Sequence, residues 1–299
     1  MPAMTTHRLA RLFLILMATL SSAPARAQEA PDREQLELQV KQLADEDPAK
    51  RDQAESALEK AGDLAEAPLR AALAGEAGRG AEATARAKRL LARIDARRRS
   101  RKLAARWGTR WFKIGKGEET IGVLRLETRI ENEEIVCDDT YEYFGNPGNR
   151  VVTRLAGDGT MAFRSFEVTE GDDKEAKVTK FDAKLHGADA MAGGFAAMRF
   201  AAMLPMEAGF EHAAPFISPW SSSLKISSTI TCVGERDGAI LFRSTTQSAE
   251  FTGTTEFRMD ADGVMLSYRS LPTPDGEESA RGEPCTEKEA AAARAAAEK

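Results

Sequence analysis

The sequence predicts an α+β protein in which a helical domain precedes a curved antiparallel sheet, a half-barrel, that is crossed by a short apolar helix. Three observations support this fold class. Apolar residues recur every three or four positions from residue 32 to about residue 106, which is the helical period. From Trp107 to about Leu271 they alternate with polar residues between short turns, as in half-buried strands. One apolar run, MAGGFAAMRFAAMLPMEAGF at 191–210, interrupts that alternation.

The first 27 residues have the order of a secretory signal peptide. Arg8 and Arg11 precede an apolar run at 12–20, and the small-residue pattern ending at Ala27 follows. A membrane-spanning helix needs roughly 18 or more apolar residues, and this run is shorter. We therefore expect cleavage after Ala27, export to the periplasm or the medium, and no transmembrane segment after cleavage.

Charge argues against nucleic acid as a partner. The chain has 42 lysine and arginine residues against 47 acidic ones, a net charge of −5, and loss of three arginines with the first 27 residues leaves about −8. Proteins that bind nucleic acid usually carry a basic excess. The predicted partners are instead a lipid or an envelope protein.

Three cysteines, Cys137, Cys232 and Cys285, would meet an oxidising compartment. Cys137 and Cys232 both fall in strand-like runs, so their pairing is the first choice for a disulfide. The alternative is three free thiols, two of them buried as small apolar residues. The chain has no CxxC motif.

The helical domain, 28–106, contains several short helices and one long one. Asp47 followed by Pro48 is typical of a helix start, and glycine at position 62 ends that helix. A further helix is expected over 63–74, and GEAGRG then forms a turn before a long helix that begins near Glu82.

The segments ALEKAG at 57–62 and LLARID at 90–95 align their apolar residues 33 positions apart. The run from VKQLADEDP to LLARID resembles a pair of HEAT- or armadillo-like helical repeats. This resemblance implies a small helical stack that makes contacts and has no catalytic role.

The long helix becomes strongly basic toward its end: Arg86–Arg106 holds ten basic residues and one acid, Asp95. One interpretation is packing against the acidic helices before it. The other is docking on an anionic partner, such as lipid headgroups or an acidic envelope polymer. The docking residues would be Arg97, Arg98, Arg99, Arg101, Lys102 and Arg106.

The β domain is predicted over 107–271. Runs at 110–114 and 120–130 flank GKGEE as a hairpin, and a mostly polar strand at 177–186 is typical of a sheet edge. Residues 272–299 are predicted to be a polar linker and a short alanine-rich C-terminal helix. Thr286 and Glu289 match a capping box at the start of that helix.

No motif indicates catalysis, a metal site or a cofactor. His186 and His212 are the only histidines after residue 27, and there is no GxSxG elbow. The glycines at 115–122 precede a strand, so they predict a hairpin and not a phosphate loop. An acidic group could gather oxygens for calcium, although solvated turn acids are the ordinary alternative. Its members are Glu131, Glu133, Glu134, Asp138 and Asp139.

Within the apolar run at 191–210, two glycines at 193–194 precede the apolar residues from Phe195, and Pro205 with Gly209 follows them, so a short helix hinged at both ends is expected. It is either a lid over an apolar ligand or a plug that fills the sheet permanently. Methionines adapt to irregular partners, which suits a lid. The candidate groove or lid residues are Met191, Phe195, Met198, Met203, Leu204 and Met206, facing Leu124, Leu126, Leu224, Ile226 and Ile230.

The order of KGEETIGVLRLETRI, then LPMEAGF, LKISSTITCVGERDGAILFRSTT and FRMDADGVMLSYRS resembles the periplasmic lipoprotein-carrier-like and DUF3108-like β proteins of bacterial envelopes. The resemblance covers about 107–271. It implies an unclosed half-barrel with a helix across its concave side, which in the carrier proteins holds acyl chains. The predicted function is non-catalytic binding of an apolar ligand or an envelope partner. The alternatives are a structural scaffold with a filled core and an envelope hydrolase.

Overall fold

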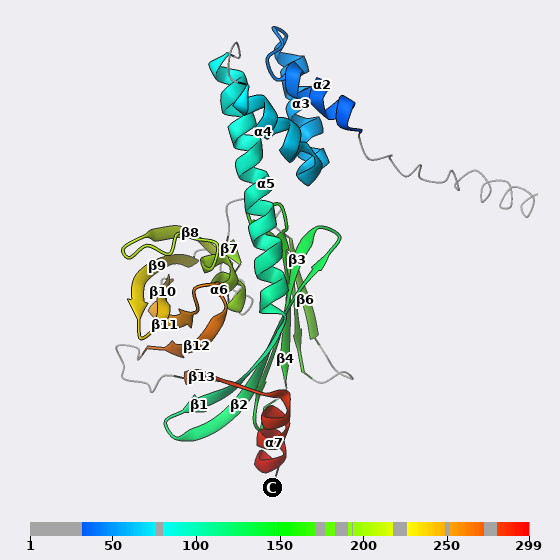
Figure 1. Ribbon diagram of the computed structural model, residues 1–299. Coiled ribbons are helices and arrows are strands. Elements are labelled where there is room, and N and C mark those ends of the chain that lie inside the picture. Colours follow the sequence, from blue (N-terminus) through cyan, green and yellow to red (C-terminus); the bar gives the residue numbers. More distant parts are fainter. Residues whose placement is uncertain are drawn as a thin grey trace, which may run out of the picture. The chain divides into compact units, whose positions relative to one another are not determined.

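The computed structural model describes residues 32–75, 80–146, 148–171, 177–182, 191–192, 194–217, 226–248, 252–271 and 280–298 (Figure 1). The protein is α+β, as the sequence predicts. Its chain divides into two compact units, Met1–Ala87 and Lys88–Lys299. The predicted signal peptide, together with His186 and Leu224, lies outside the described residues.

The described part of the first unit contains short helices, and aspartate caps mark the start of the first two. These elements are α2 (Arg33–Gln42), α3 (Pro48–Ala61), the 3-10 turn η1 (Gly62–Ala65) and α4 (Glu66–Ala74). Asp32 accepts a hydrogen bond from the Gln35 amide, and Asp47 accepts one from Ala49, so amides that a helix start leaves unpaired are satisfied. The buried apolar side chains include Leu36, Val40, Leu43, Ala54, Leu58 and Leu69. These residues confirm the predicted helical stripe.

Helix α5 (Ala81–Trp107) contributes its first turns to this unit. Arg86 donates to Asp52 at 2.8 Å and to Glu55 at 2.6 Å, and it also pairs with Glu82 one turn earlier. Hydrogen bonds to Asp52 and Glu82 raise the pKa of Arg86. At this point the acidic α3 and the basic α5 pack as complementary faces.

Within the described residues, the second unit is built on one sheet of 13 strands. Its strands are β1 (Thr109–Lys116), β2 (Glu119–Glu131), β3 (Glu134–Tyr143), β4 (Asn149–Ala156), β5 (Phe163–Glu170), β6 (Lys177–Asp182), β7 (Met191–Ala192), β8 (Glu211–Ile217), β9 (Ile226–Arg236), β10 (Ala239–Gln247), β11 (Thr252–Met259), β12 (Met265–Ser270) and β13 (Ala280–Cys285). Their spatial order is β6-β5-β4-β3-β2-β1-β13-β12-β11-β10-β9-β8-β7. Neighbours are antiparallel, except that β7 and β8 are parallel. Figure 1 shows the sheet bending between its β1–β6 part and its β8–β12 part.

Strand β13 corrects the predicted linker over residues 280–285, and residues 272–279 lie outside the described residues. The strand lies in the middle of the sheet, where it pairs with β1 on one side and β12 on the other. Gly282 faces Tyr268 across the β12–β13 pair, and a Cβ atom there would come within 1.8 Å of the Tyr268 ring. Only glycine therefore lets that ring lie flat across β13. Strand β6 is the terminal strand at one end of the sheet, which confirms the predicted polar edge strand.

The predicted domain boundary at residue 106 is also corrected, because α5 from Lys88 onward belongs to the β unit. Leu103 and Trp107 are buried in one core cluster with Phe112, Leu124 and Phe257, and Ala104 is buried in a second cluster beside it. The basic helix therefore starts in one unit and supplies core residues to the other.

Helix α7 (Glu287–Ala297) covers part of β1 and β2. Its start has the predicted capping box, in which Thr286 accepts from the Glu289 amide and the Glu289 carboxylate accepts from the Thr286 amide. Arg294 donates to Glu142 at 2.6 Å and lies over the Trp111 ring. The short alanine-rich helix is thus stabilised by packing, which a helix of this length needs.

Candidate apolar-ligand site

The predicted apolar helix exists as α6 (Phe195–Ala201), and it packs against the inner face of the sheet. We use inner face for the side that carries Leu124, Leu126 and Phe257. Six of the seven residues of α6 are buried, and Ala201 has no exposed surface. The helix itself therefore fills the fold, in agreement with the plug interpretation.

Arg199 holds α6 in place, and sequence reasoning missed it. Its side chain is 1% exposed. It donates to both carboxylate oxygens of Asp139, at 2.7 and 3.0 Å, and to the Thr128 hydroxyl at 2.7 Å. Its guanidinium also lies over the Trp107 ring at the end of α5. One side chain of α6 thus connects the helix to β2, β3 and α5.

Burial and pairing act against each other in this ion pair. Burial raises the pKa of Asp139 above its ordinary value, although Arg199 draws it down. Burial also disfavours the charged form of Arg199, but the Asp139 carboxylate outweighs it and the pKa of Arg199 is raised. The bidentate geometry satisfies charges that would be costly to bury alone. The pair therefore fixes the depth and rotation of α6.

A cavity of about 240 Å³ lies at the N-terminal end of α6. Phe195 of α6 packs against Tyr141 on one side and Tyr268 on the other, with ring centroids 5.5 and 4.9 Å apart. Burial raises the pKa of Tyr141 and of Tyr268, so both phenols stay neutral. The remaining lining residues include Tyr143, Met198, Ser244, Thr246, Thr255 and Phe257. The cavity is aromatic and carries hydroxyl groups but no acidic or basic side chain.

A groove of about 370 Å³ lies on the other side of α6, where the chain leaves the helix. The segment 202–206 forms its apolar floor with Leu103, and Asp262 in the β11–β12 turn forms a wall. Arg99, Lys102 and Arg106 of α5 line its remaining side. Arg106 pairs with Asp262. We call this the basic groove.

The structure separates the predicted groove or lid residues into three groups. Leu124, Leu126, Ile226 and Ile230 are buried in the core. Phe195 and Met198 belong to α6 and line the cavity. Met203, Leu204 and Met206 line the basic groove. The side chain of Met191 and all of Leu224 lie outside the described residues.

The predicted docking residues also have different environments. Arg101 pairs with Glu133, and Arg106 pairs with Asp262. Arg99 and Lys102 are exposed at the basic groove. Arg97 and Arg98 do not line it. The sequence could not distinguish these roles, because all six lie within three turns of one helix.

The structure does not join Cys137 to Cys232. All three cysteines are free, and the two buried ones lie in separate core clusters, on β3 and β9. Burial raises the pKa of the Cys137 thiol to about 12. Cys285 lies on β13, opposite Trp111, and not in a polar tail. The alternative of two thiols buried as small apolar residues describes Cys137 and Cys232.

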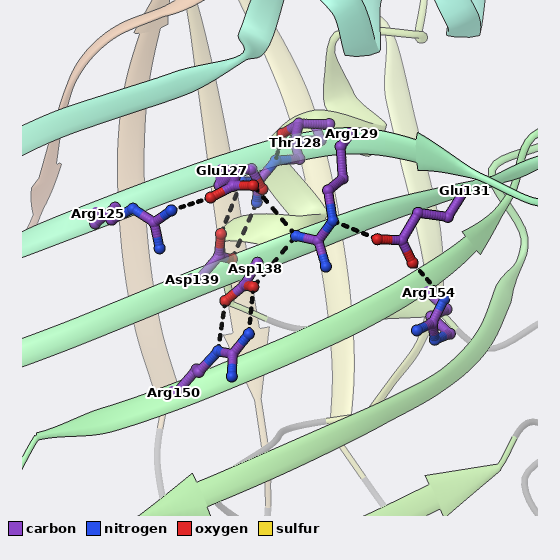
Figure 2. A network of polar contacts seen from close by, with 10 residues as sticks. Arg125, Glu127, Thr128, Arg129, Glu131, Asp138, Asp139, Arg150 and Arg154 are labelled. Atoms are coloured by element: carbon purple, nitrogen blue, oxygen red, sulfur yellow. Dashed lines mark hydrogen bonds and ion pairs between the residues drawn. The ribbon is translucent and has the colours of Figure 1, made fainter.

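Three of the acids considered for calcium, Glu131, Asp138 and Asp139, lie in a network of arginine contacts, as Figure 2 shows. On the outer face of β2, β3 and β4, Asp138 accepts from Nε and Nη2 of Arg150 at 2.8 and 2.6 Å and from Arg129 at 3.2 Å. Glu131 accepts from Arg129 at 2.5 Å and from Arg154. Arginines therefore balance the charges of Asp138 and Glu131, and Asp139 points to the inner face, toward Arg199.

Of the residues weighed for chemistry in the sequence, the structure places His212 and the glycines at 115–122. The ring of His212 lies 5.0 Å from that of Phe200, measured between centroids. The glycine-rich stretch at 115–122 forms the β1–β2 turn and its flanking strands, as predicted for a hairpin. His186 lies outside the described residues.

Comparison of the chain with protein-family models and with curated proteins finds no match. Within the part of the chain that the structure describes, no helix combines the length and apolar character needed to cross a bilayer. The cavity and the basic groove, one at each end of α6, are the places where the predicted residues meet open space.

Proposed function

We propose that the protein is a non-catalytic component of the cell envelope that binds an apolar ligand, a lipid or an acyl chain, in the cavity beside α6. The single observation that supports this most is the cavity itself, about 240 Å³ lined by aromatic rings and Met198. Binding sites for small molecules are typically concave and mostly apolar, with a few polar groups that orient the ligand. The hydroxyls of Ser244, Thr246 and Thr255 would supply those groups.

The finer fold assignments belong to the same proposal. The bent sheet with α6 across its inner face would be an unclosed half-barrel like that of the envelope carrier proteins. The helices of the first unit would form a HEAT-like pair that contacts another envelope protein. Export would follow cleavage after Ala27. Each of these statements extends the resemblances noted in the sequence.

The cavity sets the chemistry of the ligand. With Tyr141 and Tyr268 neutral and no acidic or basic side chain in the lining, a charged group inside it would be left without a partner, which is costly. The bound portion should therefore be uncharged and flat or chain-like. Any charged headgroup would remain outside.

A cavity-filling variant tests the proposal. The Thr255→Phe variant places a ring in the cavity, whereas Thr254→Phe places the same ring on the opposite face of β11, because successive side chains of a strand alternate. We expect the neutral fluorophore N-phenyl-1-naphthylamine to bind the wild-type protein and the Thr254→Phe variant. We expect its affinity for Thr255→Phe to fall about tenfold. Equal affinity for all three proteins would reject the cavity as the site.

The deep burial of α6 favours a second candidate, a structural scaffold with a filled core. Under this alternative neither the fluorophore nor a host lipid occupies the protein. Native mass spectrometry of the protein taken from its host distinguishes the two. A co-purifying lipid that is lost from Thr255→Phe supports ligand binding, and a bare chain together with no fluorophore binding supports the scaffold.

A further inference from the structure

The basic groove has a different chemistry from the cavity, because it combines cations with apolar side chains. Arg99, Lys102 and Arg106 follow a spacing of three and four along α5, so they share one side of the helix. Opposite them lie Met203, Leu204 and Met206, which are half-buried. A ligand that satisfies both sides must carry negative charge next to apolar groups.

The three walls of the groove are packed together, so its shape is set by the fold. Gly263 in the β11–β12 turn has φ +79, and a Cβ atom there would lie 3.0 Å from the Ala202 side chain and 3.2 Å from Leu103. The Asp260 carboxylate accepts from the amides of Asp262 and Val264, which holds the turn. The turn, α5 and the segment after α6 are therefore in close contact with one another.

The charges of the groove are available to a partner. Arg106 is balanced by Asp262, but Arg99 and Lys102 are exposed and make no ion pair with any residue that the structure describes. Asp262 is the one acid in the lining of the groove. Each lysine or arginine near an anionic bilayer adds to the attraction, and a few apolar side chains at the interface strengthen it further.

From this juxtaposition we infer that the basic groove docks the protein on an anionic membrane surface. The headgroup phosphate of a phospholipid lies between Arg99 and Lys102, and its glycerol and upper acyl carbons lie on Met203, Leu204 and Met206. The chain then contacts the bilayer peripherally, through one side of α5 and the segment 202–206. A free phosphate or a soluble polyanion would leave that apolar floor uncovered. This docking is separate from ligand binding in the cavity.

Vesicle binding tests the inference with a matched pair of variants. The full protein, purified from its host, is sedimented with vesicles of phosphatidylglycerol and phosphatidylcholine. A second sample is sedimented with vesicles of phosphatidylcholine alone. We expect binding to the anionic vesicles only. Lys102→Glu should weaken it about tenfold or more, since it replaces an attraction by a repulsion. Lys88→Glu makes the same charge change at an exposed position of α5 outside the groove and should retain binding.

Two further arms decide what occupies the groove. Leu204→Asn should weaken binding several-fold if acyl carbons rest on the apolar floor, with thermal unfolding confirming that the variant is folded. Glycerol phosphate in solution should compete poorly. Effective competition by it would indicate a site for free phosphate, and equal losses for Lys102→Glu and Lys88→Glu would indicate general charge attraction. Either result, or no binding to anionic vesicles, overturns the inference. Fluorophore binding in the cavity is expected to be unchanged by Lys102→Glu, so the two proposals fail independently.

Discussion

Asp138 and Asp139 are neighbours on β3, but they point to opposite faces of the sheet and meet opposite environments. Asp139 faces inward, where it is buried with one arginine, Arg199, and its pKa is raised. Asp138 faces outward beneath Arg129 and Arg150, which reach solvent. Burial alone would raise the pKa of Asp138, but hydrogen bonds from Arg150 and Arg129 outweigh it and the pKa is lowered.

The difference shows what each pair can contribute. On the outer face Arg129 and Arg150 share the buried Asp138 carboxylate, and both arginines reach solvent, so the loss of one partner leaves the other. On the inner face a single guanidinium satisfies a single carboxylate, and neither has access to water. The inner pair is therefore strongly coupled and specifies one position of α6, whereas the outer network adds small and partly redundant increments.

The largest expected effect is on the inner pair. Arg199→Met keeps most of the side-chain volume but leaves Asp139 buried without its partner, and such a loss costs about 3–5 kcal/mol. The double variant Arg199→Met with Asp139→Leu removes both charges and should recover most of the loss. Urea unfolding measures the free energies. If the double variant is as unstable as the sum of the single variants, the two residues are not coupled and the anchoring role is wrong.

Acid titration should separate the two aspartates. The folded-state pKa of Asp138 is lowered, so its ion pairs stabilise the fold above the ordinary aspartate value of 3.8 and this contribution is lost as the pH falls below it. The folded-state pKa of Asp139 is raised, so its ionisation costs stability above that pKa, and the cost disappears as the pH falls toward 3.8. The slopes of stability against pH are therefore opposite and lie in different pH windows.

The measurement is the urea midpoint at a series of pH values on both sides of 3.8. In the wild-type protein, stability should fall as the pH is lowered below 3.8, and this fall should be smaller in Asp138→Asn. The rise in stability as the pH is lowered toward 3.8 from above should be smaller in Asp139→Asn. The two asparagine variants serve as controls for each other, because they differ by one position. Identical pH profiles for the two variants would contradict the assignment of the two environments.

Much of the fold could be predicted because its signals are local. Short stretches of sequence determine the helix caps at Asp32, Asp47 and Thr286. They also determine the period-two alternation of β2 and β3. Strand β13, ARGEPC, has no such alternation, since its place depends on partners in β1 and β12 that are distant in sequence. Backbone hydrogen bonds to those two strands, and a glycine that leaves room for the Tyr268 ring, make this segment a strand although its composition is typical of a linker.

The site was predicted less well than the fold, for the same reason. The apolar helix was visible in the sequence, but Arg199 within it was not considered, and its partner Asp139 is 60 positions away. The basic groove joins α5 to a segment about 100 positions later in the chain. One signal could have helped: a single arginine inside an otherwise apolar helix has to find a carboxylate when it is buried.

The smallest effect, and a direct comparison of the faces, comes from salt. The side chain of Arg150 is 52% exposed, so Arg150→Gln should cost about 0.5–1 kcal/mol at low ionic strength. Ions reach that pair, and the Debye length falls from about 30 Å at 0.01 M to about 3 Å at 1 M, so the cost should largely vanish in 1 M sodium chloride. Arg199→Gln should cost the same at both salt concentrations, because ions do not reach the buried pair.

Urea unfolding of both variants and the wild-type protein at the two concentrations gives four differences. Equal salt dependence for the two variants would show that the inner pair is as accessible to ions as the outer one, and α6 would then be a mobile lid in place of an anchored plug.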